Sequence, residues 1–552
     1  MTKAFLFGLL SLMCGGLLRA QTVAGLGHVT FPTSTQSAVA QSDFIRGLLL
    51  LHLFEYEDAA KSFVAAENAD PGFAMAYWGE AMTFNHGVWN QVNVRAGQAA
   101  LAKFGATAEE RAGRIADARE RGYMAAVEIL YGGKGDKRER DAAYAAAMQK
   151  LAEAYPKDDE AQLFYALALL GESEGVRDVP MYLKAAEIAK SVFARDPQNP
   201  GAAHYWIHGM DDPQHAAGAL EAARALSKIA PDAGHALHMC SHIFMALGMW
   251  DDVVQANVAA ISVVNRQASA EGRQSRHSGH YSYWLEYGYL EQGRIGDAEK
   301  VLADCRAEAA ESGMAARARG TVDPDDSHVG SFVQMRSRYI VDTGRWNGEV
   351  VGWSVDLDGA EMPEFNYAFG TGFAAAERGD VAAARESLAA LGRLLPQLAA
   401  VFDHAGVPAD DPARRVPEIQ KAQMEAVILS AEGQGEEAIA TMQQAIASGK
   451  DLPYAFGPPS PAKPSEELLG ELLLKANKAA QAREAFSASL ERAPRRTESL
   501  LGLARAESAM GDQAAAAKSY AELLQIWKDA DPSYAPKEEA QRFVSGASHA
   551  AN

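Results

Sequence analysis

Cysteine is scarce in this chain, and several short motifs that would indicate a particular chemistry are missing. Of 552 residues three are cysteines, Cys14, Cys240 and Cys305, and no two of them form a CxxC pair. A CxxC-type zinc site and a framework of several disulfides are therefore excluded, although the sequence leaves open whether Cys240 and Cys305 pair. The chain also has no P-loop and no HExxH motif, so neither P-loop nucleotide binding nor zincin catalysis is expected.

Long apolar runs are also few. One lies at the N-terminus, where Lys3 precedes a mostly apolar stretch at 4–18 and Ala20 offers a cleavage position before Gln21. This order of features is typical of a signal peptide, which we predict at residues 1–20. No later run reaches the ~18 apolar residues that a membrane-spanning helix needs. We therefore expect an exported protein, periplasmic or secreted, that is not embedded in a membrane.

Positively charged residues are fewer than negatively charged residues in this chain. The chain has 52 lysines and arginines against 72 aspartates and glutamates, which gives a formal net charge of −20. Removal of residues 1–20 takes away Lys3 and Arg19 and brings the net charge to −22. Such a charge repels phosphate backbones and anionic lipids, so neither nucleic acid nor a membrane surface is an expected partner. It favours the attraction of cations.

The chain does contain a recurring helix–turn–helix pattern. Alanine, the best helix former, is abundant. Small residues recur where two helices would approach closely, an aromatic residue follows, and a proline closes the unit. The clearest units carry Gly47, Tyr56, Ala59, Phe63 and Pro71, then Gly470, Ala482, Phe486 and Pro494, then Ala504, Gly511, Ala516, Tyr520 and Pro532. This pattern resembles the tetratricopeptide repeat (TPR), a helix pair of about 34 residues.

The resemblance to TPR proteins implies an all-α fold, a superhelical solenoid of about ten to twelve helix pairs with a concave inner face. Along the chain we expect an extended segment at 21–39, a TPR-like array with inserted loops at 40–452, a proline-rich elbow at 453–464, a C-terminal TPR pair at 465–532 and a tail at 533–552.

Four segments make the chain similar to a group of exported bacterial TPR proteins. They are His28-Val-Thr-Phe-Pro-Thr-Ser34, Ala74-Met-Ala-Tyr-Trp-Gly-Glu-Ala81, His235-Ala-Leu-His-Met-Cys-Ser-His242 and Gly457-Pro-Pro-Ser-Pro-Ala-Lys-Pro-Ser465. This resemblance implies an architecture more than a function.

Histidines recur at the interval of the repeat. His204 and His208 lie at i and i+4, and a second such pair, His238 and His242, follows one repeat length later. His52 and His86 are separated by the same interval. Residues at i and i+4 share one face of a helix, and His235 joins the face of His238 by a step of three.

The TPR resemblance places these positions on the first helix of each repeat, facing the concave groove. The next unit presents His280, Tyr283 and Tyr287 at the same distances before its turn glycine. We therefore expect a groove wall made by His204, His208, Asp211 or Asp212, His235, His238, His242, His280, Tyr283 and Tyr287, with His52 and His86 in the groove of the first two repeats. Cys240 falls on the other side of its helix and is expected in the core.

Two imidazoles at i and i+4 on a helix can chelate a transition metal, as they do in the HExxH motif. Helices packed ~8–10 Å apart could add ligands from a neighbour. One interpretation is therefore a metal site made by His204, His208, His238 and His242, with Asp211, Asp212, His235, His280, Tyr283, Tyr287, His52 and His86 in the groove or around the ion. Zinc, copper or iron suits such ligands.

The same residues allow an interpretation without a metal. Repeats arise by duplication, so matched histidines can be inherited and form a hydrogen-bonded lining. The expected function is a scaffold whose groove binds a peptide, a protein or a small molecule, with or without a transition metal. The alternative is a metal-dependent enzyme, hydrolytic or oxidative, at the same histidines. The sequence leaves open whether the protein is an enzyme.

Overall fold

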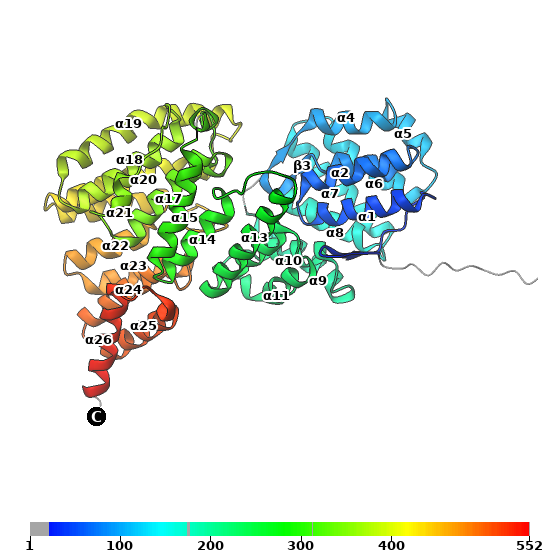
Figure 1. Ribbon diagram of the computed structural model, residues 1–552. Helices are drawn as coiled ribbons and strands as arrows, with labels where there is room; N and C mark the ends of the chain where they lie inside the picture. The colour runs from blue at the N-terminus through cyan, green and yellow to red at the C-terminus, as the bar shows by residue number, and fades with distance from the viewer. Residues whose placement is uncertain (1–20, 174–176, 312, 551–552) are drawn as a thin grey trace, which may run out of the picture. The chain divides into compact units, whose positions relative to one another are not determined.

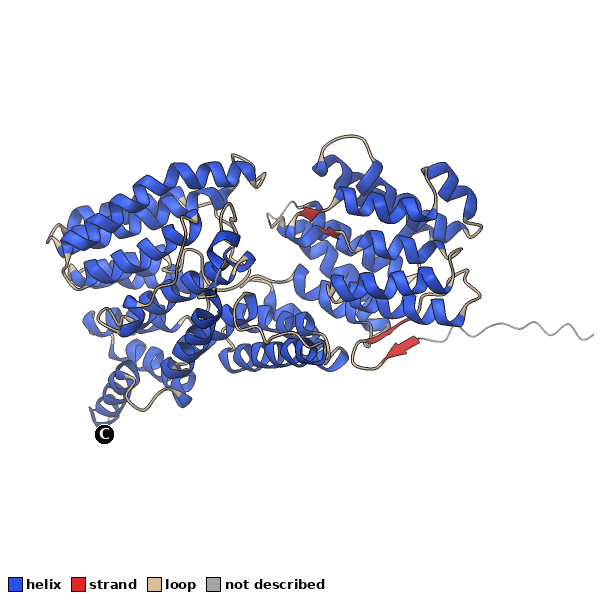
Figure 2. Ribbon diagram, turned by 45° about the horizontal axis from the view of Figure 1, so that its top comes forward, coloured by secondary structure: helices blue, strands red, loops and turns tan. Residues whose placement is uncertain are grey.

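The computed structural model describes residues 21–173, 177–311 and 313–550, so the predicted signal peptide at 1–20 lies outside the described residues. Within them the chain forms 26 α-helices and two short antiparallel strand pairs. Figure 2 shows helices throughout, with the strands as the small red elements. The predicted all-α fold class is confirmed. None of the described helices is both long and apolar enough to cross a membrane.

The chain divides into two compact units. Of the described residues, those up to Glu172 and Val192–Gly201 form the N-terminal unit, and the others form the C-terminal unit. The N-terminal unit contains β1 (Gln21–Val23), β2 (Gly27–Val29), α1 (Ala38–His52), α2 (Tyr56–Ala69), α3 (Ala74–Met82), β3 (Asn85–His86), β4 (Gln91–Val92), α4 (Val94–Phe104), α5 (Ala108–Arg114), α6 (Ala118–Gly132), α7 (Lys137–Ala154) and α8 (Asp159–Glu172).

Two helices, α9 (Val179–Arg195) and α10 (Pro200–Gly209), contribute residues to both units. The C-terminal unit continues with α11 (Leu220–Ile229), α12 (Gly234–Ala246), α13 (Trp250–Ala270), α14 (His280–Glu291), α15 (Ile295–Ala309), α16 (Met314–Arg317), α17 (His328–Thr343), α18 (Glu361–Glu377), α19 (Val381–His404), α20 (Val416–Ala431), α21 (Gly435–Ser448), α22 (Ser465–Lys475), α23 (Ala479–Arg492), α24 (Thr497–Ala509), α25 (Gln513–Ile526) and α26 (Ala535–Ala550). Figure 1 labels most of these helices.

Consecutive helices pack in pairs, and glycines let the pairs approach closely. In the N-terminal unit the Phe63 ring of α2 lies between Gly47 of α1 and Gly79 of α3, where an added Cβ would overlap the ring. In the C-terminal unit the Phe486 ring of α23 occupies the same place between Gly470 of α22 and Gly502 of α24. Each phenylalanine stands midway in sequence between its two glycines, at the same spacing in both sets, so one repeating unit builds both regions.

The structure shows what the predicted elbow and tail contain. Residues 453–464 form no helix or strand, but they pack against the helices of the C-terminal unit, because Arg338 of α17 donates to the carbonyl oxygens of Pro459 and Ala462, the latter at 2.6 Å. The predicted tail contains α26, which packs on α25 with the Tyr520 and Phe543 rings 4.7 Å apart. The proline-rich segment is therefore a packed loop and the tail is part of the helical array.

A buried cation joins four helices of the C-terminal unit. Arg496, at the start of α24, is fully buried and contacts three carboxylates: Asp342 of α17 at 2.6 Å, Glu467 of α22 at 2.8 Å and Glu291 of α14 at 3.0 Å. Because burial removes all four groups from water, the cluster is stable only while each charge keeps its partners.

The glycine packing gives the first prediction. Gly502→Val places a Cβ inside the contact distance of the Phe486 ring, so the helices must separate, and the free energy of unfolding should fall by about 1–3 kcal/mol. Gly435→Val is the matched control, because a Cβ there meets no atom within 4 Å. Urea denaturation followed by circular dichroism measures both; equal stability of the two variants would contradict the packing role of Gly502.

The ion cluster gives the second prediction. Arg496→Met leaves three buried carboxylates without their shared cation, and the free energy of unfolding should fall by about 3–5 kcal/mol. Arg505→Met is the control, since Arg505 pairs with Glu539 at 2.7 Å while its side chain is 48% exposed. Such surface pairs contribute less than about 1 kcal/mol. Similar losses in the two variants would show that the Arg496 cluster does not hold the helices together.

Candidate metal centre

Three histidines of the C-terminal unit place their ring nitrogens together. His238 and His242 lie one turn apart on α12, and His280 is the first residue of α14. The Nε2 atoms of His238 and His242 are 3.1 Å apart, and each of the three residues offers a nitrogen within 4.8 Å of the other two. Two nitrogens on one tetrahedral zinc ion, with ~2.0–2.1 Å bonds, would be about 3.3 Å apart, so this spacing fits a shared ion.

A hydrogen bond at Nδ1 fixes the orientation of each ring. The Nδ1 of His238 lies 2.7 Å from Oδ1 of Asn257, that of His242 lies 2.5 Å from Oδ2 of Asp211, and that of His280 lies 2.7 Å from Oδ2 of Asp325. Asn257 donates its own amide nitrogen to the Val253 carbonyl at 2.9 Å, which leaves Oδ1 as the acceptor.

These acceptors decide which nitrogen carries the proton. Because the Asn257 oxygen can only accept, Nδ1 of His238 donates to it, and Nε2 of the neutral His238 ring keeps its lone pair, which faces Nε2 of His242 at 3.1 Å. Burial and the nearby His280 and His242 hold the pKa of His238 well below its usual value, so this ring is neutral near pH 7. A neutral imidazole whose second nitrogen donates to a carboxylate, carbonyl or similar acceptor is the usual form of a metal-binding histidine.

The group is covered on one side and open on another. His238 is fully buried and the His242 side chain is nearly so, whereas the His280 side chain is 43% exposed. The indole of the buried Trp284 packs against the group, with its ring centre 4.4 Å from that of His242 and 4.7 Å from that of His238. An ion bound here would have access to solvent at His280.

A second group of three histidines lies beside the first. His204 and His208 of α10 and His235 of α12 also offer nitrogens within 4.8 Å of one another. The ring centres of His204 and His208 are 4.7 Å apart, and those of His204 and His235 are 5.2 Å apart. Burial and the neighbouring imidazoles lower the pKa of His208 and of His235 well below the usual value.

The grouping differs from the predicted ligand set. The sequence suggested one site made by His204, His208, His238 and His242, whereas the structure separates these into two pairs and completes the pairs with His235 and His280. The physical reason is that the third nitrogen of each group comes from the first turn of the next helix in the set α10, α12 and α14, which we call the inner helices because they carry the six histidines. Asn257 and Asp325, which orient two of the rings, were not among the predicted residues.

Asp211 and Asp212 have different roles. Asp211 accepts the hydrogen bond of His242, next to the ligand nitrogens. Asp212 turns to Arg177, whose Nη2 lies 2.6 Å away, and to His215, whose Nδ1 lies 2.9 Å away. Arg177 also donates to the last carbonyls of α10. Asp212 therefore holds the end of α10 and does not face the histidine groups.

Four other predicted groove residues lie elsewhere. Tyr283 and Tyr287 are buried, and their hydroxyl oxygens accept from Arg338 at 2.9 Å and from Arg496 at 3.3 Å, so they belong to the buried charge cluster. In the N-terminal unit His52 is fully buried, where it pairs with Glu160 and packs on Phe164. His86 bonds to the Thr83 carbonyl at 3.0 Å and stacks on Tyr56. The prediction of a groove position is wrong for His52, because its ring is a core residue.

Cys240 is buried as predicted, and both it and Cys305 are free thiols, so they do not pair. Burial raises the pKa of Cys240 to about 12. Neither thiol belongs to the histidine groups.

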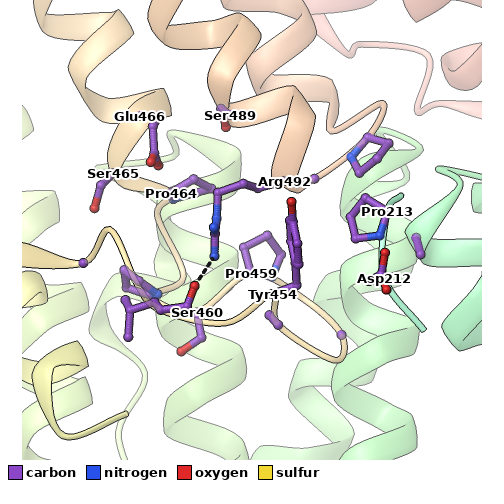
Figure 3. A pocket seen from close by; sticks show the side chains of 18 of the residues that line it. Asp212, Pro213, Tyr454, Pro459, Ser460, Pro464, Ser465, Glu466, Ser489 and Arg492 are labelled. Atoms are coloured by element: carbon purple, nitrogen blue, oxygen red, sulfur yellow. Dashed lines mark hydrogen bonds between the residues drawn. The ribbon is translucent and has the colours of Figure 1, made fainter. Parts of the chain in front are cut away.

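A cavity of about 280 Å³ adjoins the first histidine group, because His242 and Asp211 are among the residues that line it. Figure 3 shows Asp212 and Pro213 on one side and Tyr454, Pro459 and Arg492 of the C-terminal segments on the other. The Arg492 guanidinium lies 5.0 Å from the centre of the Tyr454 ring and donates to the Pro453 carbonyl at 2.9 Å. The cavity therefore leaves space for water or a small molecule next to His242, a candidate metal ligand.

No family model and no curated protein matches this sequence. Solved structures similar to this chain include the APC/C hetero-tetramer Cut9–Hcn1, at 10% identity over 94% of this chain and 78% of that chain with a TM-score of 0.32. Human IFIT1, a dimer with PPP-AAAA, has 12% identity over 90% and 92% with a TM-score of 0.36. Yeast Tom70 has 11% identity over 92% and 95% with a TM-score of 0.27.

Proposed function

We propose that this chain is a TPR-like scaffold that binds a transition-metal ion through the Nε2 atoms of His238, His242 and His280, and that a ligand or partner group occupies the ion's remaining position. The observation that carries the proposal is the convergence of the three rings, each with Nδ1 committed to an acceptor. Three nitrogen ligands leave one position of a tetrahedral zinc ion for water or an incoming ligand.

The chemistry of the ligands restricts which metal ions can bind. Imidazole nitrogen suits zinc, copper and iron, whereas calcium and magnesium prefer oxygen ligands. The carboxylates of Asp211 and Asp325 lie directly behind two of the rings and offset part of the charge of a divalent ion. Zinc, copper or iron is therefore the expected occupant.

Two features support binding of a further molecule at the ion. The exposed ring of His280 gives access from solvent, and the 280 Å³ cavity has His242 and Asp211 in its wall. The proposed partner is a peptide, a protein or a small molecule. The apolar, signal-like residues 1–20 support export to the periplasm or the medium. The net charge of −22 without these residues supports a partner other than nucleic acid.

A second candidate function is a metal-dependent enzyme, hydrolytic or oxidative. It is favoured by a group of three histidines beside a cavity, because an ion held by three nitrogens has a position left at which it can lower the pKa of water or polarise a substrate. Turnover of ester, peptide or phosphoester probes, or consumption of dioxygen, by zinc-, copper- or iron-loaded protein would favour the enzyme. Binding without turnover favours the scaffold.

The third prediction concerns His280. His280→Ala should remove the ion of this site without unfolding the protein, because the side chain is 43% exposed. His404→Ala is the matched control, since His404 is an exposed histidine at the end of α19. Mass spectrometry of metals in tag-free protein, purified without chelator and reconstituted with zinc, measures the ions per chain. A His280→Ala variant that keeps the metal content of the control would contradict the proposal.

The fourth prediction concerns Asp211. Asp211→Asn keeps an acceptor for His242 Nδ1 but removes the negative charge, so zinc affinity should fall by roughly 10–100-fold with little loss of helix. Competition with a fluorescent zinc chelator measures the affinity, and circular dichroism checks the fold. Asp232→Asn, at an exposed carboxylate that pairs with Arg266, is the control. Equal zinc affinity in the two variants would show that Asp211 does not support the site.

A further inference from the structure

We propose that His204, His208 and His235 form a second transition-metal site, so that the protein holds two ions in neighbouring sites that differ in their exposure to solvent. The inference goes beyond the site at His238, His242 and His280 and does not require it. It rests on the repeated placement of six histidines on three inner helices, α10, α12 and α14.

The two groups are built by one rule. In each, two histidines at i and i+4 come from one inner helix, and the third comes from the first turn of the next inner helix. His204 and His208 of α10 combine with His235 of α12, and His238 and His242 of α12 combine with His280 of α14. The helix α12 thus gives its first-turn histidine to one group and its other two to the next.

The repeat register shows that these positions are equivalent. His204 and His208 precede His238 and His242 by one repeat length, and His280 stands as far before the turn residue Gly293 as His235 stands before Gly248. The same register places Gly201 on α10, and Tyr283 and Tyr287 on α14, at the three remaining positions of the pattern. A histidine at position 201 would complete a group with the preceding repeat, and histidines at positions 283 and 287 would form a group with the following repeat.

The distribution of these histidines distinguishes residues that were selected as ligands from residues that were only inherited when the repeat was duplicated. If duplication alone had kept a histidine lining, histidine would be expected at all three positions on every helix. Instead, histidine occupies all six positions that belong to the two groups, and it is absent from the three positions that do not belong to either group. Gly201 approaches the His52 ring, and the two tyrosines turn to Arg338 and Arg496. The pattern therefore follows the requirement for two sets of three nitrogens.

The environment predicts different behaviour of the two ions. His204 is fully buried, His208 is nearly so and His235 is half-buried, whereas His280 of the other group is exposed. Three nitrogen ligands leave one position at each ion, and solvent reaches that position more easily beside His280. The sites are adjacent, because the ring centres of His208 and His242 are 6.3 Å apart, as are those of His235 and His238. Imidazole-only ligands favour zinc or copper over calcium or magnesium.

The test is zinc stoichiometry of chelator-stripped, reconstituted protein spanning residues 21–552, with circular dichroism as the check of fold. The wild type and His404→Ala should hold two zinc ions per chain. His235→Ala should hold one, and so should His204→Ala/His208→Ala. His235→Ala keeps the test valid if the buried double variant fails to fold. The ion that remains in His280→Ala should transfer to a chelator more slowly than the ion that remains in His235→Ala.

The outcomes distinguish the two proposals. A single zinc ion in the wild type, or an unchanged content in folded His235→Ala, overturns the second site. Loss of all zinc in either His235→Ala or His280→Ala also overturns it, because one shared ion would then use both groups. Loss of one ion in His235→Ala with no loss in His280→Ala supports this inference while it contradicts the site at His238, His242 and His280.

Discussion

The close approach of neighbouring helices is the constraint on which the rest of the structure depends. Gly47, Gly79, Gly470 and Gly502 let an aromatic ring enter between helices. Gly209 of α10 and Gly288 of α14 let neighbouring helices approach closely in another way, because an added Cβ would lie 2.6 Å from the Ala186 Cβ and 2.9 Å from the Val254 side chain. Because the inner helices are held this near, side chains one turn apart on one helix meet a side chain from the first turn of the next. The histidine groups follow from that geometry, and so does the burial that keeps His238 neutral.

A site of buried imidazoles is costly unless each ring has its hydrogen bonds. In the group at His238, His242 and His280 the cost is offset by Asn257, Asp211 and Asp325, which come from α13, from the residues after α10 and from the loop before α17. These acceptors also prevent the rings from turning Nδ1 toward the ion. The helix α14, which begins with His280, is held to α17 and α22 by the Arg496 contacts, so this ring is positioned by the buried ion cluster as well as by Asp325.

Much of the fold and part of the site could be predicted from the sequence, because both depend on short-range spacing. The helical period and the glycine–aromatic pattern indicated the helix pairs, and the i, i+4 and one-repeat intervals indicated which histidines share a face. No spacing pattern in the sequence indicated the contacts between distant segments. Asn257 lies on a different helix, Asp325 in an inserted loop, and the partners of Tyr283 and Tyr287 come from α17 and α24. His52 has the same interval to His86 as the site histidines, yet Glu160 and Phe164 make it a core residue.

Diffraction from a crystal of zinc-loaded protein, recorded at wavelengths on both sides of the zinc absorption edge, would locate the ion directly. If the three histidines bind zinc, an anomalous peak should lie roughly 2.0–2.1 Å from the Nε2 atoms of His238, His242 and His280. Asp211, Asn257 and Asp325 should remain on the Nδ1 atoms. A fully loaded crystal with no anomalous peak among these three histidines, or with zinc only at surface carboxylates, would show that they do not form a metal site.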